Sequence, residues 1–562
     1  MNHSHKFARR RVAALGVLVV VFAILLLRLL FVQVFESNAL GAASDAEIDT
    51  PVALTAARGT IYDRSGNAIA ISAPETEVIA DPFQITHPKK EAAILGPILG
   101  LPSARLAVEM GEHSGYVLLD QYAGSGAAAK VTSLRFAGIT EAPTWERFTP
   151  GGSGFEPLLG VVNAADDGAS GLEYQYNSLL AGHAGSEVLE ESPDGVTLPG
   201  GVLMKRPSAP GTGIELSIDP ALQLDTYQAV AAEVTQSHAT QGMALVLNTR
   251  TGGILAAVNL LGGPQPGSSP VSAPSALALT QVFEPGSMMK LTTFAGALTQ
   301  GIITQTTTET VPDQLPIDGS IFHDAESHPT ETLTDTQVID QSSNVGTIEI
   351  AQRLGTSAVY NWIRRLGFGS PTGLHYPGDS PGIVNPPSRW SPTAIGSTPI
   401  GQNEAVSALQ MADAYNAIAN GGIFIPPHFL DGTVGPKGNL HKLKPSPSHR
   451  VISVAVASTL ASMLSGVVAN QGTAPAAAIP GYSVIGKTGT AQVPSTTHPG
   501  YTPGDYFGSF VGFAPSQHPV ITAIVVLKHA AQMYGGSVAA PVFATIVGDA
   551  LHLFRVPPSV AG

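Results

Sequence analysis

The sequence predicts an α/β domain in its C-terminal part, a mixed α+β region before it, and one membrane-spanning helix at the N-terminus. Three observations support this prediction. An apolar run occupies residues 12–35, the stretch that follows mixes short strand-like and helical segments with many glycines, and the part after residue 213 has strand patterns at both ends and helical patterns between them. Strands at the two ends of a mainly helical stretch indicate one sheet assembled from both ends.

Length and composition narrow the classes of protein that this chain can be. The 562 residues are 44% hydrophobic and 12% charged, which is enough for two or more domains with a large core. A net charge of −14, without a basic patch, argues against a nucleic-acid-binding protein. The absence of cysteine excludes disulfides and thiol catalysis, and the 16 histidines show no ligand spacing with carboxylates. We therefore expect neither a metal nor a cofactor.

The N-terminus predicts a membrane anchor. Four basic residues lie within residues 1–11, and the apolar run VAALGVLVVVFAILLLRLLFVQVF follows over residues 12–35, interrupted only by Arg28. About 20 apolar residues span a bilayer as a helix, and flanking basic residues stay in the cytoplasm. We expect a cytoplasmic tail over 1–11, an anchor over 12–35 and the rest of the chain outside the cytoplasm. A cleaved signal peptide is the alternative, but its apolar region is typically about 7–15 residues long.

Residues 36–213 predict a non-catalytic docking region. The stretch RGTIYDRSGNAIAI (58–71) has a polar turn between apolar alternations and predicts a hairpin. The stretch GASGLEYQYNSLLAG (168–182) predicts a turn that leads into a short amphipathic helix. Because no catalytic group of residues occurs here, we interpret 36–213 as an N-terminal pedestal domain for dimerisation or docking.

Residues 214–562 predict one α/β domain. A strand over 214–217 precedes Asp219-Pro220, which open a helix with proline at its first position. Helical patterns then dominate to about residue 470. The remaining predicted strands, two before and three after that helical part, are GMALVLNT, GGILAAVNL, YSVIGKTGTAQV, FGSFVGFAPS and VITAIVVLK.

The first candidate site is EPGSMMK (284–290). Ser287 lies at a predicted helix start, and Lys290 at i+3 lies on the same face. This spacing suits a serine nucleophile with a lysine base, which must lose its proton and therefore needs burial or a second cation nearby. Alone the pattern is weak, since an N-cap serine is the commoner explanation of it. We expect Met288 and Met289 to pack into the core.

The second candidate site is Ser342 and Asn344, in DTQVIDQSSNVG between two predicted helices. A hydroxyl and an amide two residues apart in a turn can both face a cleft, where they relay a proton and bind an amide substrate. Ser65-Gly66-Asn67 has the same pattern, but it lies in a polar turn and we assign it to structure.

The third candidate site is Lys487-Thr488-Gly489-Thr490, on a predicted strand. Lys487 would attract a substrate carboxylate, Thr488 would hydrogen-bond it, and Gly489 would let substrate backbone approach an edge strand closely. The backbone N–H groups of Thr490 and Ser287 could form an oxyanion hole. The alternative is a solvated lysine on an edge strand with a glycine.

The three patterns together, Ser-x-x-Lys, Ser-x-Asn and Lys-Thr-Gly in this order, are typical of active-site serine enzymes that recognise penicillin. The chain resembles class B penicillin-binding proteins, the monofunctional D,D-transpeptidases of peptidoglycan synthesis, from the anchor to about Phe554. This resemblance implies a penicillin-binding transpeptidase, or serine β-lactamase-like, fold. Six further stretches carry it: RGTIYDRSGNAIA, GLEYQYNSLLAG, LSIDPALQ, PIGQNEAVSALQMADAYNAIANGG, FGSFVGFAP and MYGGSVAAPVF.

The resemblance implies a role for each candidate residue. Ser287 would attack the penultimate D-Ala carbonyl of a stem peptide and release the terminal D-Ala, and an amine of a neighbouring stem peptide would then resolve the acyl-enzyme into a crosslink. The other implied roles are general base for Lys290, proton route to the leaving amine for Ser342 and Lys487, peptide positioning for Asn344, and binding of the terminal carboxylate, or that of a β-lactam, for Thr488 and Thr490.

The resemblance also implies a place in the cell. A Ser-Ser-Asn second motif, where elongation-type relatives often have aspartate at the third position, favours the septal type and thus cell division over cell shape. Implied partners are stem peptides, β-lactams and inner-membrane divisome proteins, including a polytopic SEDS-type glycosyltransferase, with 36–213 as the contact surface. Alternatives are an elongation-type transpeptidase, a D,D-carboxypeptidase, a β-lactam sensor and a β-lactamase. A β-lactamase would need neither anchor nor pedestal, and no Glu-x-x-x-Asn loop stands out.

Overall fold

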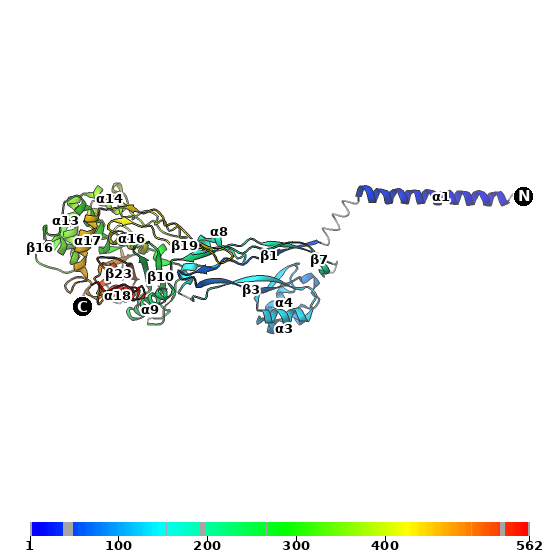
Figure 1. The fold of residues 1–562 in the computed structure, drawn as a ribbon, viewed down its shortest axis with the longest axis horizontal. Helices are drawn as coiled ribbons and strands as arrows, with labels where there is room; N and C mark the ends of the chain where they lie inside the picture. Colours follow the sequence, from blue (N-terminus) through cyan, green and yellow to red (C-terminus); the bar gives the residue numbers. More distant parts are fainter. Residues whose placement is uncertain are drawn as a thin grey trace. The chain divides into compact units, whose positions relative to one another are not determined.

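The computed structural model describes residues 3–36, 49–152, 154–191, 197–265, 267–495, 497–528 and 534–559. These residues form two compact units that are interleaved along the chain (Figure 1). Unit 1 consists of Met1–Ala56, Glu75–Thr144 and Gly182–Ala209, and unit 2 of Ala57–Pro74, Trp145–Ala181 and Pro210–Gly562. The predicted limits of 36–213 and 214–562 divide the chain linearly, and they stay a prediction.

Unit 1 begins with α1 (His3–Phe31), a long helix that continues into the π-helical turn η1 (Val32–Glu36). Its segment Arg10–Val34 has a mean hydropathy of 3.0, and none of the apolar window within it is buried inside the protein. An unburied helix of this length and hydropathy is a candidate membrane span. It coincides with the predicted anchor.

Among its other described residues, unit 1 contains one small sheet, part of a seven-stranded sheet and three α-helices. One sheet is antiparallel with the order β1-β6-β7. In the other, residues 76–80 of β3 pair with β4, and the helices pack beside them around buried Leu95, Leu106 and Leu119. The elements are β1 (Asp49–Leu54), β6 (Gly185–Glu191), β7 (Thr197–Arg206), β3 (Ala68–Ala80), β4 (Val117–Ala123), α3 (Pro88–Leu99), α4 (Ser103–Glu109) and α5 (Ser125–Leu134).

Unit 2 is built around a six-stranded antiparallel sheet of order β11-β10-β9-β24-β23-β22. The central pair β9–β24 joins the start of the unit to its end, which confirms the predicted sheet built from both ends of the segment. The strands are β9 (Gln241–Asn248), β10 (Ile254–Leu261), β11 (Val271–Ser272), β22 (Ile485–Pro494), β23 (Tyr501–Ala514) and β24 (Ile521–Lys528).

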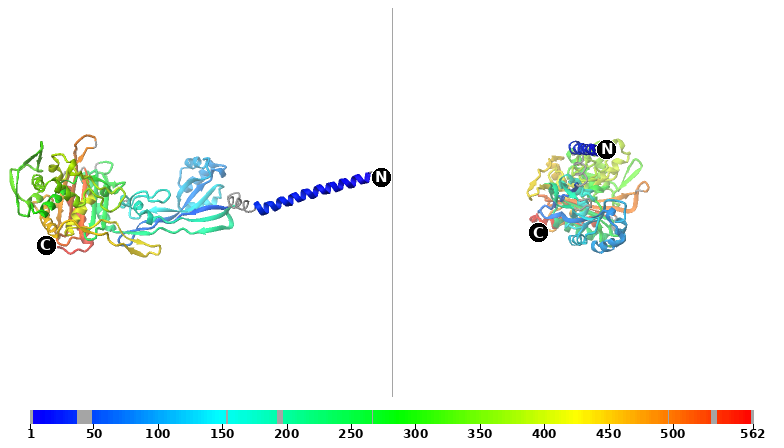
Figure 2. Two further views of the ribbon diagram at one scale, coloured as in Figure 1. Left: turned by 90° about the horizontal axis from the view of Figure 1, so that it is seen from above. Right: turned by 90° about the vertical axis from the view of Figure 1, so that its right-hand side faces the viewer.

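Helices cover both faces of this sheet. Figure 1 shows α9 (Pro220–Ser237) and α18 (Gly535–Leu553) below the strands and α16 (Ala408–Ala419) above them, and Figure 2 gives two further views of these layers. The helix α18 is long and apolar enough to be considered as a membrane span, but half of it is buried in the unit. It is therefore a core helix of unit 2.

A helix cap and a polar turn lie where the sequence predicted them. Asp219 accepts hydrogen bonds from the amides of Ala221 and Leu222 and so caps α9, with Pro220 at its first position. The predicted hairpin forms between β2 (Ile61–Tyr62) and β3, and Asp63 accepts the amides of Ser65 and Asn67. The Ser65-Gly66-Asn67 pattern is thus a structural turn, as predicted.

Two local predictions differ from the structure. The stretch 168–182 forms two short helices, α7 (Gly171–Gln175) and α8 (Asn177–Leu180), because Tyr176 between them leaves helical geometry. The part expected to be mainly helical also contains two antiparallel strand pairs, which lie between α11 (Lys290–Thr299) and α12 (Asp335–Asp340). These pairs are β13 (Thr308–Val311) with β16 (Glu331–Thr334) and β14 (Gln314–Ile317) with β15 (Ser320–His323).

Candidate active site

A cavity of about 720 Å³ in unit 2 brings the three predicted motifs together. Its lining includes Ser287 from the first motif, Ser342 and Asn344 from the second, and Thr488 and Thr490 from the third. Lys290 and Lys487 lie behind this wall and are fully buried. The predicted residues come from segments that lie up to about 200 residues apart in the sequence, and the fold brings them to one cavity.

Ser287 lies in a single 3-10 turn, η3 (Gly286–Met289), directly before α11 (Lys290–Thr299). Gly286 has φ +56°, and a Cβ on it would lie 2.8 Å from the carbonyl oxygen of Thr490. Only glycine fits such a position, because its backbone is left-handed and presses against β22. The turn thereby places Ser287 beside Thr490, as an oxyanion hole made from these two N–H groups requires.

Buried neighbours hold this turn from behind. Met288 and Met289 are fully buried, as predicted, and the Tyr415 hydroxyl donates to the carbonyl oxygen of Met288 at 3.1 Å. The amide of Gly286 donates to the carbonyl oxygen of Gly401 at 3.1 Å. Ser287 is therefore presented by a rigid segment.

Lys290 is buried and points at the second motif. Its Nζ donates to the carbonyl oxygen of Ser342, to Ser342 Oγ at 3.2 Å and to Asn344 Oδ1 at 2.8 Å. Among the described residues, no hydrogen bond joins Lys290 Nζ to Ser287 Oγ. Such catalytic contacts often tighten only when substrate is bound.

Burial lowers the pKa of Lys290 well below its ordinary value, and the nearby charge of Lys487 lowers it further, while Asp324 opposes the shift. These are the two causes that the sequence analysis required of a lysine base. A buried amine with a lowered pKa can be neutral at physiological pH and can therefore accept a proton.

The second motif is a tight junction between α12 (Asp335–Asp340) and α13 (Asn344–Leu354). Ser342 has φ +63°, an uncommon conformation for a non-glycine residue. Ser343 is the N-cap of α13, and its hydroxyl accepts the amide of Gly346 at 3.0 Å. The left-handed residue turns the chain so that Ser342 Oγ and Asn344 Oδ1 both face Lys290 Nζ.

The third motif lies on β22, the edge strand of the sheet. Lys487 Nζ donates to Thr488 Oγ1 at 3.3 Å. Burial lowers the pKa of Lys487 to about 7, and the carboxylate of Asp340 opposes this shift. Thr488 Oγ1 lies 3.2 Å from Thr473 Oγ1, and Thr490 Oγ1 accepts the amide of Gly535 at 3.3 Å. The predicted solvated lysine is excluded, because Lys487 has no exposed surface.

Gly489 allows the chain itself to approach β22. A Cβ on Gly489 would lie 2.4 Å from Ser509 Oγ and 2.8 Å from the carbonyl oxygen of Pro285, in the segment that leads to Ser287. We expected this space to receive substrate backbone. In the structure the atoms beside Gly489 belong to the protein and bring the first and third motifs into contact.

Sequence reasoning missed several residues of the cavity wall. Asp324 and His328 reach it from the loop between β15 and β16, and Gln402, Thr473 and Tyr534 reach it from three other segments. No local pattern marks these residues. The only sequence signal for Asp324 and His328 is their place in a polar loop before the second motif.

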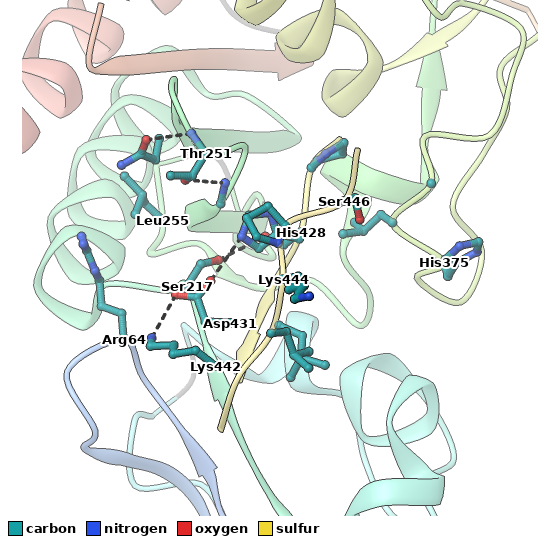
Figure 3. Close-up of a pocket in the computed structure, with 18 of the residues that line it drawn as sticks. Arg64, Ser217, Thr251, Leu255, His375, His428, Asp431, Lys442, Lys444 and Ser446 are labelled. Atoms are coloured by element: carbon teal, nitrogen blue, oxygen red, sulfur yellow. Dashed lines mark hydrogen bonds and ion pairs between the residues drawn. The ribbon is translucent and has the colours of Figure 1, made fainter. Parts of the chain in front are cut away.

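A second cavity, of about 570 Å³, shares no lining residue with the first (Figure 3). Several of its charged side chains are in ion pairs: His428 Nε2 lies 3.2 Å and Lys442 Nζ 3.8 Å from Asp431, and Arg64 lies 3.7 Å from Asp219. None of the three predicted motifs lines this cavity. The cavity at Ser287 is therefore the candidate active site.

Comparison with known proteins finds similarity along most of the chain. Residues 242–548 match the family model "Penicillin binding protein transpeptidase domain", and residues 53–216 match the "Penicillin-binding Protein dimerisation domain". The chain is 30% identical to penicillin-binding protein PbpB of Mycobacterium tuberculosis, over 97% of this chain and 85% of that protein. It is 27% identical to peptidoglycan D,D-transpeptidase FtsI of Escherichia coli, over 99% of this chain and 94% of that protein.

A solved structure extends the similarity to three dimensions. Penicillin-binding protein 3 of Mycobacterium tuberculosis, complexed with ampicillin, is 27% identical and matches with a TM-score of 0.70, over 91% of this chain and 98% of that chain.

Proposed function

Because the chain belongs to the penicillin-binding protein family through its transpeptidase domain, we propose that it crosslinks peptidoglycan through an acyl-enzyme on Ser287, in septal cell-wall synthesis. It is a class B penicillin-binding protein and a serine-type D,D-transpeptidase, as its relatives named peptidoglycan D,D-transpeptidase are. One observation carries the residue roles. Lys290 is buried with a lowered pKa, and its Nζ joins Ser342 and Asn344 behind a cavity that Ser287 and Thr488 line.

Acylation begins at Ser287. Neutral Lys290 takes the proton of Ser287 Oγ while this oxygen forms a bond to the penultimate D-Ala carbonyl carbon of a stem peptide. The N–H groups of Ser287 and Thr490 would stabilise the developing oxyanion. The C–N bond then breaks, the proton reaches the leaving amine through Ser342 Oγ, and the terminal D-Ala departs.

Deacylation uses a second stem peptide. Its amine attacks the acyl carbon, an amide bond forms while the ester bond to Ser287 Oγ breaks, and the proton that the amine loses returns to Ser287 Oγ through the same Lys290 and Ser342 groups. A β-lactam takes the place of the first peptide, and its ring C–N bond breaks instead.

The remaining residues bind and orient the substrate. Thr488 and Thr490 on the edge strand would hydrogen-bond the terminal carboxylate, with Lys487 behind them supplying positive charge when it is protonated. Asn344 Oδ1 accepts a hydrogen bond from Lys290 Nζ, and Asn344 Nδ2 donates one hydrogen to the carbonyl oxygen of His323 at 3.0 Å. Its second amide hydrogen remains to position the peptide.

The N-terminal helix would anchor the protein in the cytoplasmic membrane as a single span, with the catalytic unit outside the cytoplasm. Septal work would require contact with divisome proteins of the inner membrane, including a polytopic SEDS-type glycosyltransferase. The region matched by the dimerisation model is the surface that we propose for these contacts.

Labelling with a fluorescent penicillin tests the nucleophile. We expect wild-type protein and Ser133→Ala, which removes an exposed hydroxyl in unit 1, to be labelled, and Ser287→Ala to remain unlabelled. Labelling of Ser287→Ala would overturn the assignment, and rapid hydrolysis of the drug would indicate a β-lactamase. Depletion in cells tests the cellular role, since filamentation indicates septal work and rounding indicates elongation.

A further inference from the structure

Asp324 is an acidic residue whose carboxylate is committed to the second motif. Its Oδ1 accepts the amides of Asn344 and Val345, the latter at 3.0 Å, and its Oδ2 accepts the hydroxyl of Ser343 at 2.8 Å. The residue comes from the loop after β15, so it reaches α13 from outside the helix. A single side chain thus binds three consecutive residues at the helix start.

These bonds control the direction of Asn344. A carboxylate at a helix N-terminus is favoured both by the free N–H groups and by the helix dipole, and charge-assisted bonds of this kind are strong. The adjacent residue His323 also contributes, because its carbonyl oxygen accepts Asn344 Nδ2 at 3.0 Å. The side-chain amide of Asn344 is therefore held through its Nδ2 by His323, while its Oδ1 accepts a hydrogen bond from Lys290 Nζ.

The same bonds hold the left-handed turn at Ser342. This residue has φ +63°, a conformation that costs free energy and persists only where neighbouring contacts impose it. Asp324 binds the two residues that follow the turn, Ser343 and Asn344. Without that anchor, the turn could relax and carry Ser342 Oγ away from Lys290 Nζ, from which it now lies 3.2 Å.

His328 completes the arrangement. Its Nε2 lies 3.2 Å from Asp324 Oδ2, and its Nδ1 lies 2.7 Å from the carbonyl oxygen of Pro329. Both partners are acceptors, whereas a neutral imidazole carries only one N–H. Both hydrogen bonds can form only when the ring is a cation, so the geometry fits an imidazolium paired with the Asp324 carboxylate.

The surroundings of this pair are mainly acidic. Asp313, whose carboxylate accepts the amide of His328 at 3.1 Å, and Glu331 face His328, while Lys290 and Glu349 face Asp324. The bond to Pro329, and then those to Asp324, raise the pKa of His328 above its ordinary value of 6.5. The cation is present at low pH and is lost as the pH rises through this raised value.

We propose that Asp324 and His328 form a positioning pair that holds Ser342 and Asn344 in line with Lys290, and that this pair makes acylation sensitive to pH. Neither residue exchanges a proton with the substrate. The inference rests on the proposed function, because it takes Ser287 and Lys290 as nucleophile and base.

The test measures acylation by a chromogenic β-lactam between pH 5 and 10. The acylation constant of the bound drug is determined separately from the dissociation constant of the non-covalent complex. Asp324→Asn should lower the acylation constant about tenfold or more, since a small misplacement of catalytic groups costs this much. The acidic limb of the pH–rate profile of this variant should move to lower pH, because Asp324 raises the pKa of Lys290 in the wild type. The dissociation constant should change little.

The ring at position 328 is tested by two replacements. His328→Gln removes the cation and should lower the acylation constant about three- to fivefold at pH 6, as for a partly exposed ion pair. His328→Lys keeps a cation at all these pH values and should retain the rate at alkaline pH where wild type declines. Because His328 is partly exposed, these two variants carry the test if Asp324→Asn does not fold.

Asp318→Asn is the matched control. It removes one carboxylate from the same hairpin, at an exposed turn position whose φ of +47° asparagine tolerates. The proposal is overturned if the acylation constants of Asp324→Asn and His328→Gln depend on pH in the same way as that of this control, even if their absolute values differ. Acylation of Ser287→Ala in the same assay would instead overturn the proposed function itself.

Discussion

Two of the places where unit 2 buries charged side chains differ in whether opposite charges are paired there. In the first, Glu173 binds Arg58 at 2.6 Å and Arg147 at 2.7 Å, and all three side chains are at most 6% exposed. In the second, Lys290 and Lys487 are both fully buried, with neutral acceptors and the partial influence of Asp324 and Asp340 around them.

The difference separates a structural centre from a reactive one. Arg58 and Glu173 come from RGTIYDRSGNAIA and GLEYQYNSLLAG, and their ion pair joins two distant segments of unit 2. Guanidinium groups keep their charge, so this centre can only hold the fold. Two buried amines cannot both stay charged at low cost, and their lowered pKa values make them able to accept and return protons.

Removal of the Lys290 amine should give the largest effect. We expect Lys290→Met to lower the rate of β-lactam acylation about 10²- to 10⁴-fold, the usual contribution of a positioned base. The melting temperature should be equal or higher, because a desolvated amine disappears from the interior. An acylation rate within a few-fold of wild type would contradict the contrast between the two centres.

Removal of one charge from the centre of Arg58, Arg147 and Glu173 should act on stability instead. Glu173→Gln leaves two buried guanidinium groups without their counter-ion, and we expect a loss of about 3–5 kcal/mol in the free energy of unfolding. Denaturant titration measures it. Glu146→Gln, next to Arg147 on β5 (Ile139–Phe148), is the control, because Glu146 makes no ion pair within the described ranges.

The pH dependence of stability should sharpen the contrast. Lys487 has a pKa of about 7 in the folded protein against an ordinary 10.5, so the unfolded chain binds more protons between these values. Stability should therefore rise with pH over this interval, by at most about 1.4 kcal/mol per pH unit for each such lysine. Lys487→Met should reduce the slope between pH 7 and 10, and an unchanged slope would show that Lys487 titrates normally.

The smallest effect should come from a carboxyl pair beside the nucleophile. Glu284 accepts the Tyr501 hydroxyl at 3.0 Å and the Asn403 amide at 3.3 Å, and burial raises its pKa. Glu404 is buried nearby, and its pKa is raised well above normal, first by burial and then by Glu284. Tyr501→Phe removes one hydrogen bond and should cost about 0.5–1.5 kcal/mol of stability, with acylation reduced less than about threefold. A tenfold loss of acylation would place Tyr501 among the catalytic residues.

Sequence patterns predicted most of the frame of the site. The apolar runs of β9, β10 and β22–β24 are local, and so are the cap at Asp219 and the spacing from Ser287 to Lys290. The hairpins between α11 and α12 were missed, because their strands have only four residues each and one mostly exposed face. Asp324 and His328 were missed with them, since the partners of Asp324 at the start of α13 lie about 20 residues further along the chain, and His328 contacts Asp324.

The sequence by itself determined the order of the three motifs, the anchor and the two-ended sheet, because hydrophobic period, helix caps and motif spacing are properties of neighbouring residues. Only the tertiary structure decided how far the lysines are desolvated, which atoms fill the space beside Gly489, and which carboxylate holds the second motif. These depend on burial and on the distances between segments far apart in the chain, which set the pKa of Lys290 and Lys487 and through them the chemistry of Ser287.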